Sequence, residues 1–498
     1  MSDDTAAVTE PAVATHAAAT PGRRERVSAF VRRPRISMLA LWLLQFGIVV
    51  GFIFFYGAST AHGLVTMDLS PKRMIAIFGF ADAGSYLQAA ENLIANSRST
   101  EEWAWVLNLW PPGMVWLDAA IIRFSPLGFG LTFGLVVALV WSLTLSVLTW
   151  PFVRSLRWIA VVLVVELALL GSSPFQSWMF DEGLFYADAI AAGLFVLGLG
   201  LIVNRVRAAA NVQAWIRDGV FAGIAFASAV YFRASYNLVP WALFGVAVVI
   251  GVVLLVRIRR KRDLGDLAKQ GLMLAAAGLS ILILMQPYTA FVQQDRGRTQ
   301  FVQTEDLVFE HAWENSATKD IPQWMIDGGS TIGCDLDRPQ CLEFEDENDA
   351  GDPPTPDELR DSLVGAILAK PLEFAGNRVN AVTRQWFGDE LDSYSHVDTD
   401  YRTDAVTYSS SPNTNPAQNI LFLALLIASF VSAIVLAVRG RWALLLVPIL
   451  ALALLAPFAI VHVEVRYLIP LKLIGLFTPV LLLMLRDSTR RRRASTPE

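Results

Sequence analysis

The densest group of ionisable residues lies in a short segment between two very apolar runs. This segment reads His462-Val-Glu464-Val-Arg466-Tyr467. Placing ionisable side chains at the edge of an apolar phase costs free energy, so such residues usually have a functional role there. Lys472 follows Arg466 by about 9 Å along a helix, which lets its long side chain reach back toward Arg466. The segment is therefore a candidate anion site.

Asp82 is the candidate group for proton transfer. It lies in Phe-Ala-Asp82-Ala-Gly-Ser-Tyr86, at the start of a helical pattern. A carboxylate in that place is an ordinary N-cap, which accepts hydrogen bonds from free backbone amides. The same carboxylate is suited to act as a general base that takes a proton from a hydroxyl. These residues alone leave both roles open.

Arg233 and the pair Asp181-Glu182 lie at the ends of other apolar runs. An arginine at such an edge needs an anionic partner, which is either a neighbouring carboxylate or a phosphate that matches the guanidinium. Asp181-Glu182 suit three roles: N-caps, acceptor-binding groups or metal ligands. No metal site is predicted and no cofactor is certain, although a divalent cation is left open. Glu166, inside an apolar run, is expected to hydrogen-bond a neighbouring helix.

A membrane-embedded scaffold must position these residues. Hydrophobic residues make up 54% of the 498 residues and charged residues 17%, which is more apolar surface than a soluble core needs. Apolar runs of about 20 residues recur, and a helix of that length crosses the hydrocarbon layer. The net charge of −5 gives no sign of nucleic-acid binding. We expect an all-α polytopic membrane protein with about ten spans, near residues 39–55, 128–151, 157–172, 184–204, 217–233, 237–257, 268–290, 419–438, 442–461 and 466–486.

The basic residues set the expected topology, because loops rich in Lys and Arg stay cytoplasmic. The basic clusters are Arg154 and Arg157; Arg205, Arg207 and Arg217; residues 257–262; Arg439 and Arg441; and Arg490 to Arg493. All of them agree on one orientation, with both termini cytoplasmic and the candidate residues outside. Alanine- and arginine-rich ends are typical of a bacterium of high genomic GC, so we expect the plasma membrane.

The expected organisation has five parts. They are a disordered basic cytoplasmic tail (1–36), an N-terminal transmembrane module (37–290) with a first outer loop (59–127), an extracytoplasmic insert (291–418), C-terminal transmembrane helices (419–486) and a basic cytoplasmic tail (487–498). The apolar stretch 111–124 is expected to lie in the outer interface, because a crossing there would reverse the topology. The sequence itself does not decide whether it crosses.

The insert is expected to fold as a small helical cap, with an amphipathic stretch over 358–387. Cys334 and Cys341 both fall in it, in an exported loop where disulfides are stable. A disulfide is therefore favoured over two free thiols.

Together these motifs resemble those of the GT-C glycosyltransferases, membrane enzymes that use polyprenyl-phosphate sugars and include protein O-mannosyltransferases and the lipid A aminoarabinose transferase. The shared features are an acid followed by Tyr in the first outer loop, Pro111-Pro112 at the return to the membrane, an outer-turn arginine, and His462-x-Glu464-x-Arg466-Tyr467, similar to the His-Lys-Glu-x-Arg-Phe pattern of mannosyltransferases. The resemblance implies that Asp82 is the catalytic base and that Arg466 and Arg233 hold the lipid phosphate. It also implies that the stretch 358–387 is a juxtamembrane helix at the membrane surface. Many members carry two adjacent acids in that loop, whereas Ala81 precedes Asp82 here.

The sequence thus predicts an inverting transfer of a sugar from a polyprenyl-phosphate carrier to an extracytoplasmic glycan, lipid or protein. Lys472 is expected to assist with the phosphate. The supporting residues are expected to be Tyr86, Asp181, Glu182, His462, Glu464 and Tyr467.

A transporter or lipid-linked-sugar flippase is the main alternative, and it would show internal repeats and charges near the bilayer midplane. A non-catalytic scaffold for an envelope-synthesis complex is a third. The sugar, the acceptor and the oligomeric state are not readable from the sequence.

Overall fold

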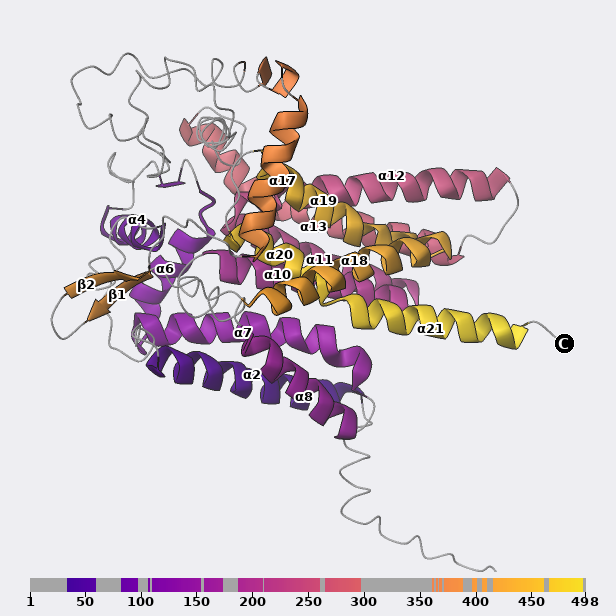
Figure 1. Ribbon diagram of the computed structural model, residues 1–498, viewed down its shortest axis with the longest axis horizontal. Coiled ribbons are helices and arrows are strands. Elements are labelled where there is room, and N and C mark those ends of the chain that lie inside the picture. The colour runs from indigo at the N-terminus through magenta and orange to yellow at the C-terminus, as the bar shows by residue number, and fades with distance from the viewer. Residues whose placement is uncertain are drawn as a thin grey trace, which may run out of the picture.

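The computed structural model of this protein shows a bundle of long helices with shorter elements at one end (Figure 1). The described residues are 34–59, 82–96, 106–107, 110–153, 156–172, 187–208, 210–259, 265–296, 361, 364–365, 367–369, 371–387, 396–400, 405–409, 415–460 and 465–495. Among the predicted features, the N-terminal tail up to residue 33, most of the insert, and both Cys334 and Cys341 lie outside these residues.

Long apolar helices make up the bundle. They are α2 (Pro34–Ser59), α7 (Phe129–Thr149), α8 (Leu156–Leu170), α10 (Ala187–Arg207), α11 (Val212–Phe232), α12 (Leu238–Arg259), α13 (Gly265–Arg296), α18 (Pro416–Val438), α19 (Leu446–Ile460), α20 (Val465–Gly475) and α21 (Thr478–Ser495). Short 3-10 turns, η1 (Trp150–Phe152), η3 (Ala234–Asn237) and η4 (Trp442–Leu445), join some of them. Most of these helices run side by side along one direction (Figure 1).

Six helices within the described residues are long and apolar enough to cross a membrane. They cover Phe129–Phe152, Ala187–Arg207, Ala234–Arg259, Gly265–Gln294, Pro416–Val438 and Tyr467–Thr489. Shorter apolar helices cover Met38–Phe54, Ile159–Leu170 and Trp442–Ala456. The remaining predicted span corresponds to α11, which carries Arg217 and Asp218 near its start. Each predicted span therefore coincides with a helix, while the number of actual crossings stays a prediction.

Buried polar contacts join the first helices of the bundle. Gln45 on α2 donates a hydrogen bond to Glu166 on α8 and another, 3.0 Å long, to Thr149 Oγ1 at the end of α7. The side chains of Gln45 and Glu166 are both buried. Hydrogen bonding between helices is favourable where no water is available. The prediction that Glu166 bonds a neighbouring helix is confirmed.

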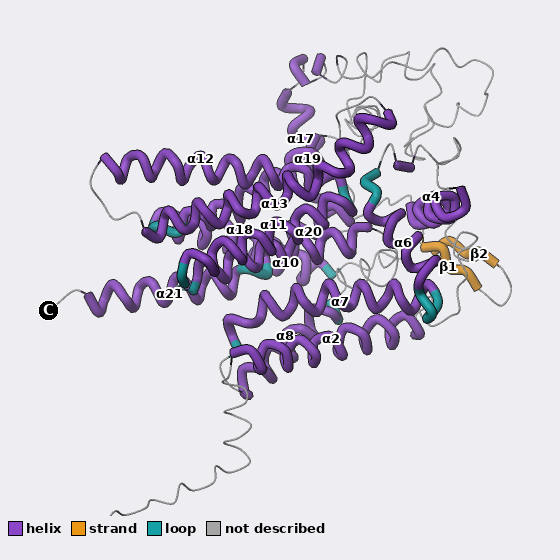
Figure 2. Tube along the Cα trace, turned by 180° about the vertical axis from the view of Figure 1, so that it is seen from behind, coloured by secondary structure: helices purple, strands orange, loops and turns teal. Residues whose placement is uncertain are grey.

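Shorter elements gather at one end of the bundle. They include α4 (Asp82–Asn96) and α6 (Gly113–Phe124), and the hairpin of β1 (His396–Asp400) and β2 (Ala405–Ser409) lies beside them, away from the C-terminus (Figure 2). The hairpin is antiparallel, with His396 opposite Ser409, and it is the one departure from the expected all-α fold among the described residues. At 1.5 Å per residue α6 is about 18 Å long, too short to cross the hydrocarbon layer.

Helix α17 (Pro371–Phe387) lies within the predicted juxtamembrane helix. It crosses the direction of the bundle helices (Figure 1) and packs on α18, α19 and α20. Its last two residues, Trp386 and Phe387, pack against the core. This helix of the insert thus packs directly on the C-terminal helices.

Candidate active site at one end of the bundle

Helix α4 begins at Asp82, the predicted acid. The residues that follow are small, and Ala83, Tyr86 and Ala90 are buried. They recur at spacings of three and four residues, which gives α4 one face that packs on α6. The side chain of Asp82 lies outside the described residues. The roles predicted for Asp82, N-cap and general base, therefore both stay predictions.

Helix α6 packs against both α4 and the end of α11. The rings of Tyr86 and Trp110 meet edge to face with centroids 5.3 Å apart. Gly113, the first residue of α6, lies against the backbone of Tyr231, so closely that a Cβ atom there would be 2.5 Å from the Tyr231 carbonyl oxygen. Only glycine allows that approach. The Pro111-Pro112 return thus places α6 directly on the last turn of α11.

Arg233 follows that turn and pairs with a carboxylate. Its Nε donates to Asp188 Oδ1 over 2.7 Å, and both side chains are about nine-tenths buried. Asp188 lies in the first turn of α10, where the helix dipole favours a negative charge. Of the two partners considered for Arg233, the neighbouring carboxylate is present.

The face of the same guanidinium packs on the aromatic ring of Tyr467. The Arg233 Cζ atom lies 5.2 Å from the ring centroid, a distance at which a cation and a π face attract. Tyr467 is the third residue of α20, directly after Arg466. The ends of α10, α11 and α20 therefore meet at Arg233. Through α6, this meeting point is connected to the helix that begins at Asp82.

Lys472 points elsewhere. Its buried ammonium donates to the Asn419 Oδ1 atom over 2.8 Å and to the Trp386 carbonyl oxygen over 3.1 Å. These contacts engage Lys472 with α17 and α18, while the side chain of Arg466, toward which it was expected to reach, lies outside the described residues. We therefore leave Lys472 out of the phosphate site proposed below.

Several predicted site residues are not tested. Asp181, Glu182, His462 and Glu464 lie outside the described residues, as does the side chain of Arg466. Their roles stay predictions. Within the part of the chain that the structure describes, no group of three or more His, Cys, Asp or Glu residues could hold a metal ion.

Two buried acids were missed by the sequence analysis. The sequence signal for Asp188 was its place in the first turn of an apolar helix, where the helix dipole favours a negative charge. Asp118 also had one, since it falls at helical spacing between Met114 and Ile121 on the apolar face of α6.

Asp118 is fully buried, and neither of its carboxyl oxygens has a hydrogen-bond partner among the described residues. Burial raises the pKa of Asp118 well above its usual value of 3.8. The folded protein therefore binds this proton more tightly than the unfolded chain does. The stability contributed by the group is fully present below pH 3.8 and is lost as the pH rises toward the folded pKa.

Replacing Asp118 with Leu is expected to stabilise the protein at neutral pH. The substitution removes an unsatisfied buried group, whose cost is about 1–3 kcal/mol, so the melting temperature in detergent should rise at pH 7 and change less between pH 5 and pH 8. Glu91→Gln, on the partly exposed surface of α4, should change stability by less than about 0.5 kcal/mol. A lower melting temperature for Asp118→Leu at pH 7 would mean that the carboxyl has a partner.

The Asp188–Arg233 pair gives a second stability prediction. Asp188→Ala should lower the free energy of unfolding by about 3–5 kcal/mol, because it leaves a buried guanidinium without its counter-ion. The double change Asp188→Leu with Arg233→Met should cost much less than Asp188→Ala. As a control, Asp266→Ala breaks an exposed ion pair with Lys269 and should cost about 0–1 kcal/mol. Equal losses for the single and double variants in detergent denaturation would show that the two charges do not depend on each other.

No protein-family model matches the chain, and no curated protein matches it. Among solved structures it is similar to the archaeal oligosaccharyltransferase AglB from Archaeoglobus fulgidus, in complex with an inhibitory peptide and a dolichol-phosphate. The two share 12% identity at a TM-score of 0.44, over 93% of this chain and 52% of that chain. The chain thus spans about half the length of AglB. So distant a likeness carries no weight for activity, which has to be inferred from the residues and contacts described above.

Proposed function

We propose that this protein is a multi-pass membrane glycosyltransferase that moves a sugar from a polyprenyl-phosphate carrier to an extracytoplasmic acceptor hydroxyl. One observation carries the proposal. The helix that begins at Asp82 and the helix that carries Arg466 and Tyr467 in its first turn are linked at one end of the bundle through contacts of α6 and Arg233. A candidate base and a candidate anion-binding group, far apart in sequence, thus belong to two helices that are linked by a chain of contacts, which supports the proposal.

The proposed reaction is a single displacement at the anomeric carbon. Asp82 takes the proton of the acceptor hydroxyl, whose oxygen forms the new bond to the anomeric carbon. The bond from that carbon to the phosphate oxygen breaks, and polyprenyl phosphate leaves with the electron pair. Attack from the opposite face inverts the configuration.

Arg466 is the proposed partner of the leaving phosphate. A fixed cation near a developing negative charge stabilises the transition state more than the ground state. Arg233 is proposed to act in a supporting way. Its charge is already balanced by Asp188, and its contact with Tyr467 fixes the first turn of α20 beside Arg466.

The proposed topology suits a lipid-borne donor. The ten predicted spans would cross the plasma membrane with both termini in the cytoplasm, and α4 and α6 would lie outside. A carrier lipid delivers its sugar at that surface, where nucleotide sugars are absent. His462, Glu464, Asp181 and Glu182 are proposed to complete the site, and a divalent cation at the two adjacent acids is an open part of the proposal.

A transfer assay with the purified full-length protein in proteoliposomes tests the function. Polyprenyl-phosphate sugars carrying different labelled sugars are supplied together with an envelope extract as acceptor. Enzyme-dependent release of polyprenyl phosphate, with label appearing in the acceptor, is the expected result. Movement of intact labelled donor across the bilayer without release would support the flippase alternative and reject the enzyme.

A further inference from the structure

The strongest unassigned feature is a buried cluster in which α17, α18 and α20 meet. We call Trp386, Asn419 and Lys472 the α17 latch. The side chains of all three residues are at least 95% buried. Trp386 lies at the end of α17, Asn419 in the first turns of α18, and Lys472 within α20. None of the three belongs to the proposed reaction.

The α17 latch is closed by hydrogen bonds in both directions. Trp386 Nε1 donates to the Asn419 carbonyl oxygen over 3.1 Å, and Asn419 Nδ2 donates to the Phe387 carbonyl oxygen over 3.4 Å. Lys472 donates to Asn419 Oδ1 and to the Trp386 carbonyl oxygen, at 2.8 Å and 3.1 Å. Without Lys472, these two buried oxygen atoms, one at the end of α17 and one at the start of α18, would lose this hydrogen bond. Leaving a buried acceptor without a donor is destabilising.

The charge of Lys472 makes this cluster unusual. Among the described residues no carboxylate lies within ion-pair distance of its Nζ atom. Neutral oxygens and the Trp386 ring, whose centroid is 5.2 Å from Nζ, compensate the charge instead. A buried ammonium is expensive, and a neutral side chain would fill the same volume at lower cost. Simple packing therefore does not account for a lysine at this position.

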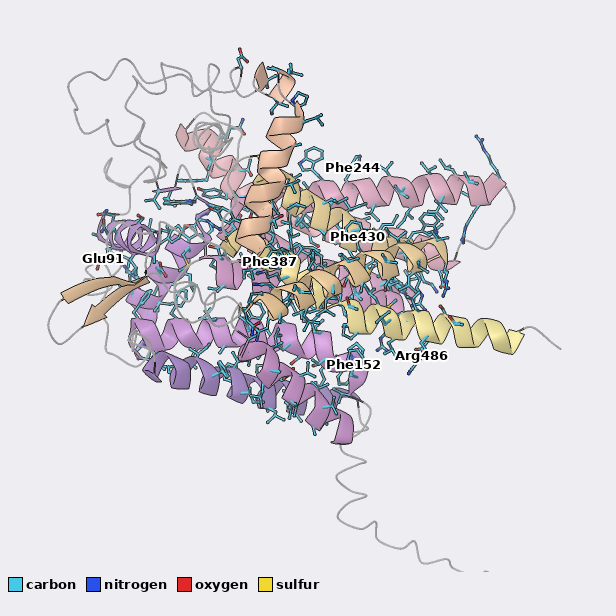
Figure 3. All side chains as sticks on the ribbon, in the orientation of Figure 1. Glu91, Phe152, Phe244, Phe387, Phe430 and Arg486 are labelled. Atoms are coloured by element: carbon cyan, nitrogen blue, oxygen red, sulfur yellow. The ribbon has the colours of Figure 1, made fainter. Side chains whose placement is uncertain are left out.

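The α17 latch connects two regions with different roles. On one side is α17, a helix of the insert, whose end at Phe387 lies against the bundle (Figure 3). On the other is α20, which carries Arg466 and Tyr467 in its first turn and Lys472 five residues after Tyr467. Tyr467 in turn contacts Arg233. A displacement of α17 would therefore be transmitted to the first turn of α20.

We propose that Lys472 is a positioning residue that couples the docking of α17 to the placement of Arg466 and Tyr467. This inference rests on the proposed function for its kinetic consequence, but the docking itself does not depend on it. Through this coupling, the insert controls how well the donor phosphate is held. The insert thus acts on the donor site without supplying a group to the reaction.

Lys472→Met tests the coupling in the full-length protein in nanodiscs, because methionine keeps the length of the side chain and removes the charge and the donors. Amide exchange in α17 should accelerate by about tenfold or more as the helix opens locally. The KM for the donor should rise by about tenfold or more with a smaller change in kcat, since a phosphate contact that is equally strong in the ground state and the transition state affects KM and not kcat. Lys472→Arg should restore part of both. Lys269→Met, on a partly exposed lysine of α13, is the control and should change neither.

Trp386→Phe provides a second variant in case Lys472→Met does not fold. It keeps a ring beside Lys472 but loses the hydrogen bond to the Asn419 carbonyl, so α17 should loosen to a smaller extent. Unchanged α17 exchange in both variants would overturn the latch. Loosened α17 with unchanged donor KM would overturn the coupling. If the wild-type protein transfers no sugar from any donor, the proposed function fails, while the exchange measurement still decides whether the latch exists.

Discussion

Asp82→Asn is expected to reduce sugar transfer by about 10²–10⁴-fold, the usual contribution of a general base. The amide has nearly the same shape and can still accept a hydrogen bond at the start of α4, so the helix should remain. The proton of the acceptor hydroxyl would then have no base to receive it. Initial rates of transfer from labelled polyprenyl-phosphate sugar, measured in proteoliposomes at saturating donor, provide the test.

Glu91→Gln is the matched control for this change. Glu91 lies on the same helix, nine residues after Asp82, and is partly exposed at the end of the bundle where α4 and α6 lie (Figure 3). It should keep transfer within about twofold, as is usual for a surface substitution away from a site. Transfer by Asp82→Asn at the wild-type rate would remove Asp82 from the mechanism and leave it only the role of an N-cap.

Arg466→Gln is expected to lower kcat/KM for the donor by about 10²–10³-fold, as the loss of a group that stabilises a developing negative charge does elsewhere. Arg466→Lys should recover part of the loss, because an ammonium keeps the charge but not the planar fork of donors. Steady-state kinetics over a range of donor concentrations separates weaker donor binding from slower chemistry.

Arg486→Gln is the control for a general loss of positive charge. Arg486 lies on α21, at the far end of the bundle from Glu91 (Figure 3), with a side chain that is about half exposed. Its replacement should leave kcat/KM unchanged. Equal losses for Arg466→Gln and Arg486→Gln would indicate a nonspecific effect of charge on the lipid substrate.

The apolar runs predicted the helices of the bundle well. A long uncharged run in an apolar phase forms a helix because the helix makes its backbone hydrogen bonds within the segment. The runs at 128–151 and 419–438, for example, became α7 and α18 with ends within a few residues. The start of α4 at Asp82 was also predictable, since small and apolar residues recur after it at helical spacing.

The direction of Lys472 was not predicted because distance along a helix was considered without rotation around it. Six residues advance a helix by about 9 Å but turn it by about 240°, so Arg466 and Lys472 lie on different faces. The Asp188–Arg233 pair was missed for another reason. Its members are 45 residues apart and come from two helices, and only the packing of those helices identifies the partner.

The hairpin was missed because its strands are short and lie in a polar, acidic insert. Val397, Val406 and Tyr408 favour strands, but each strand has only five residues, too few for a clear alternation. Asp118 shows a different limit. The spacing that places it on the buried face of α6 was visible in the sequence, but its lack of a hydrogen-bond partner depends on what surrounds it.

A cryo-electron microscopy structure of the protein in nanodiscs with bound polyprenyl phosphate tests the central claim most directly. The expected density places the lipid phosphate within about 3 Å of the Arg466 guanidinium, a normal charge-assisted contact, in a cleft that also contains the Asp82 carboxylate. A phosphate bound at the opposite end of the bundle, or Asp82 and Arg466 facing separate clefts, would contradict the proposed reaction.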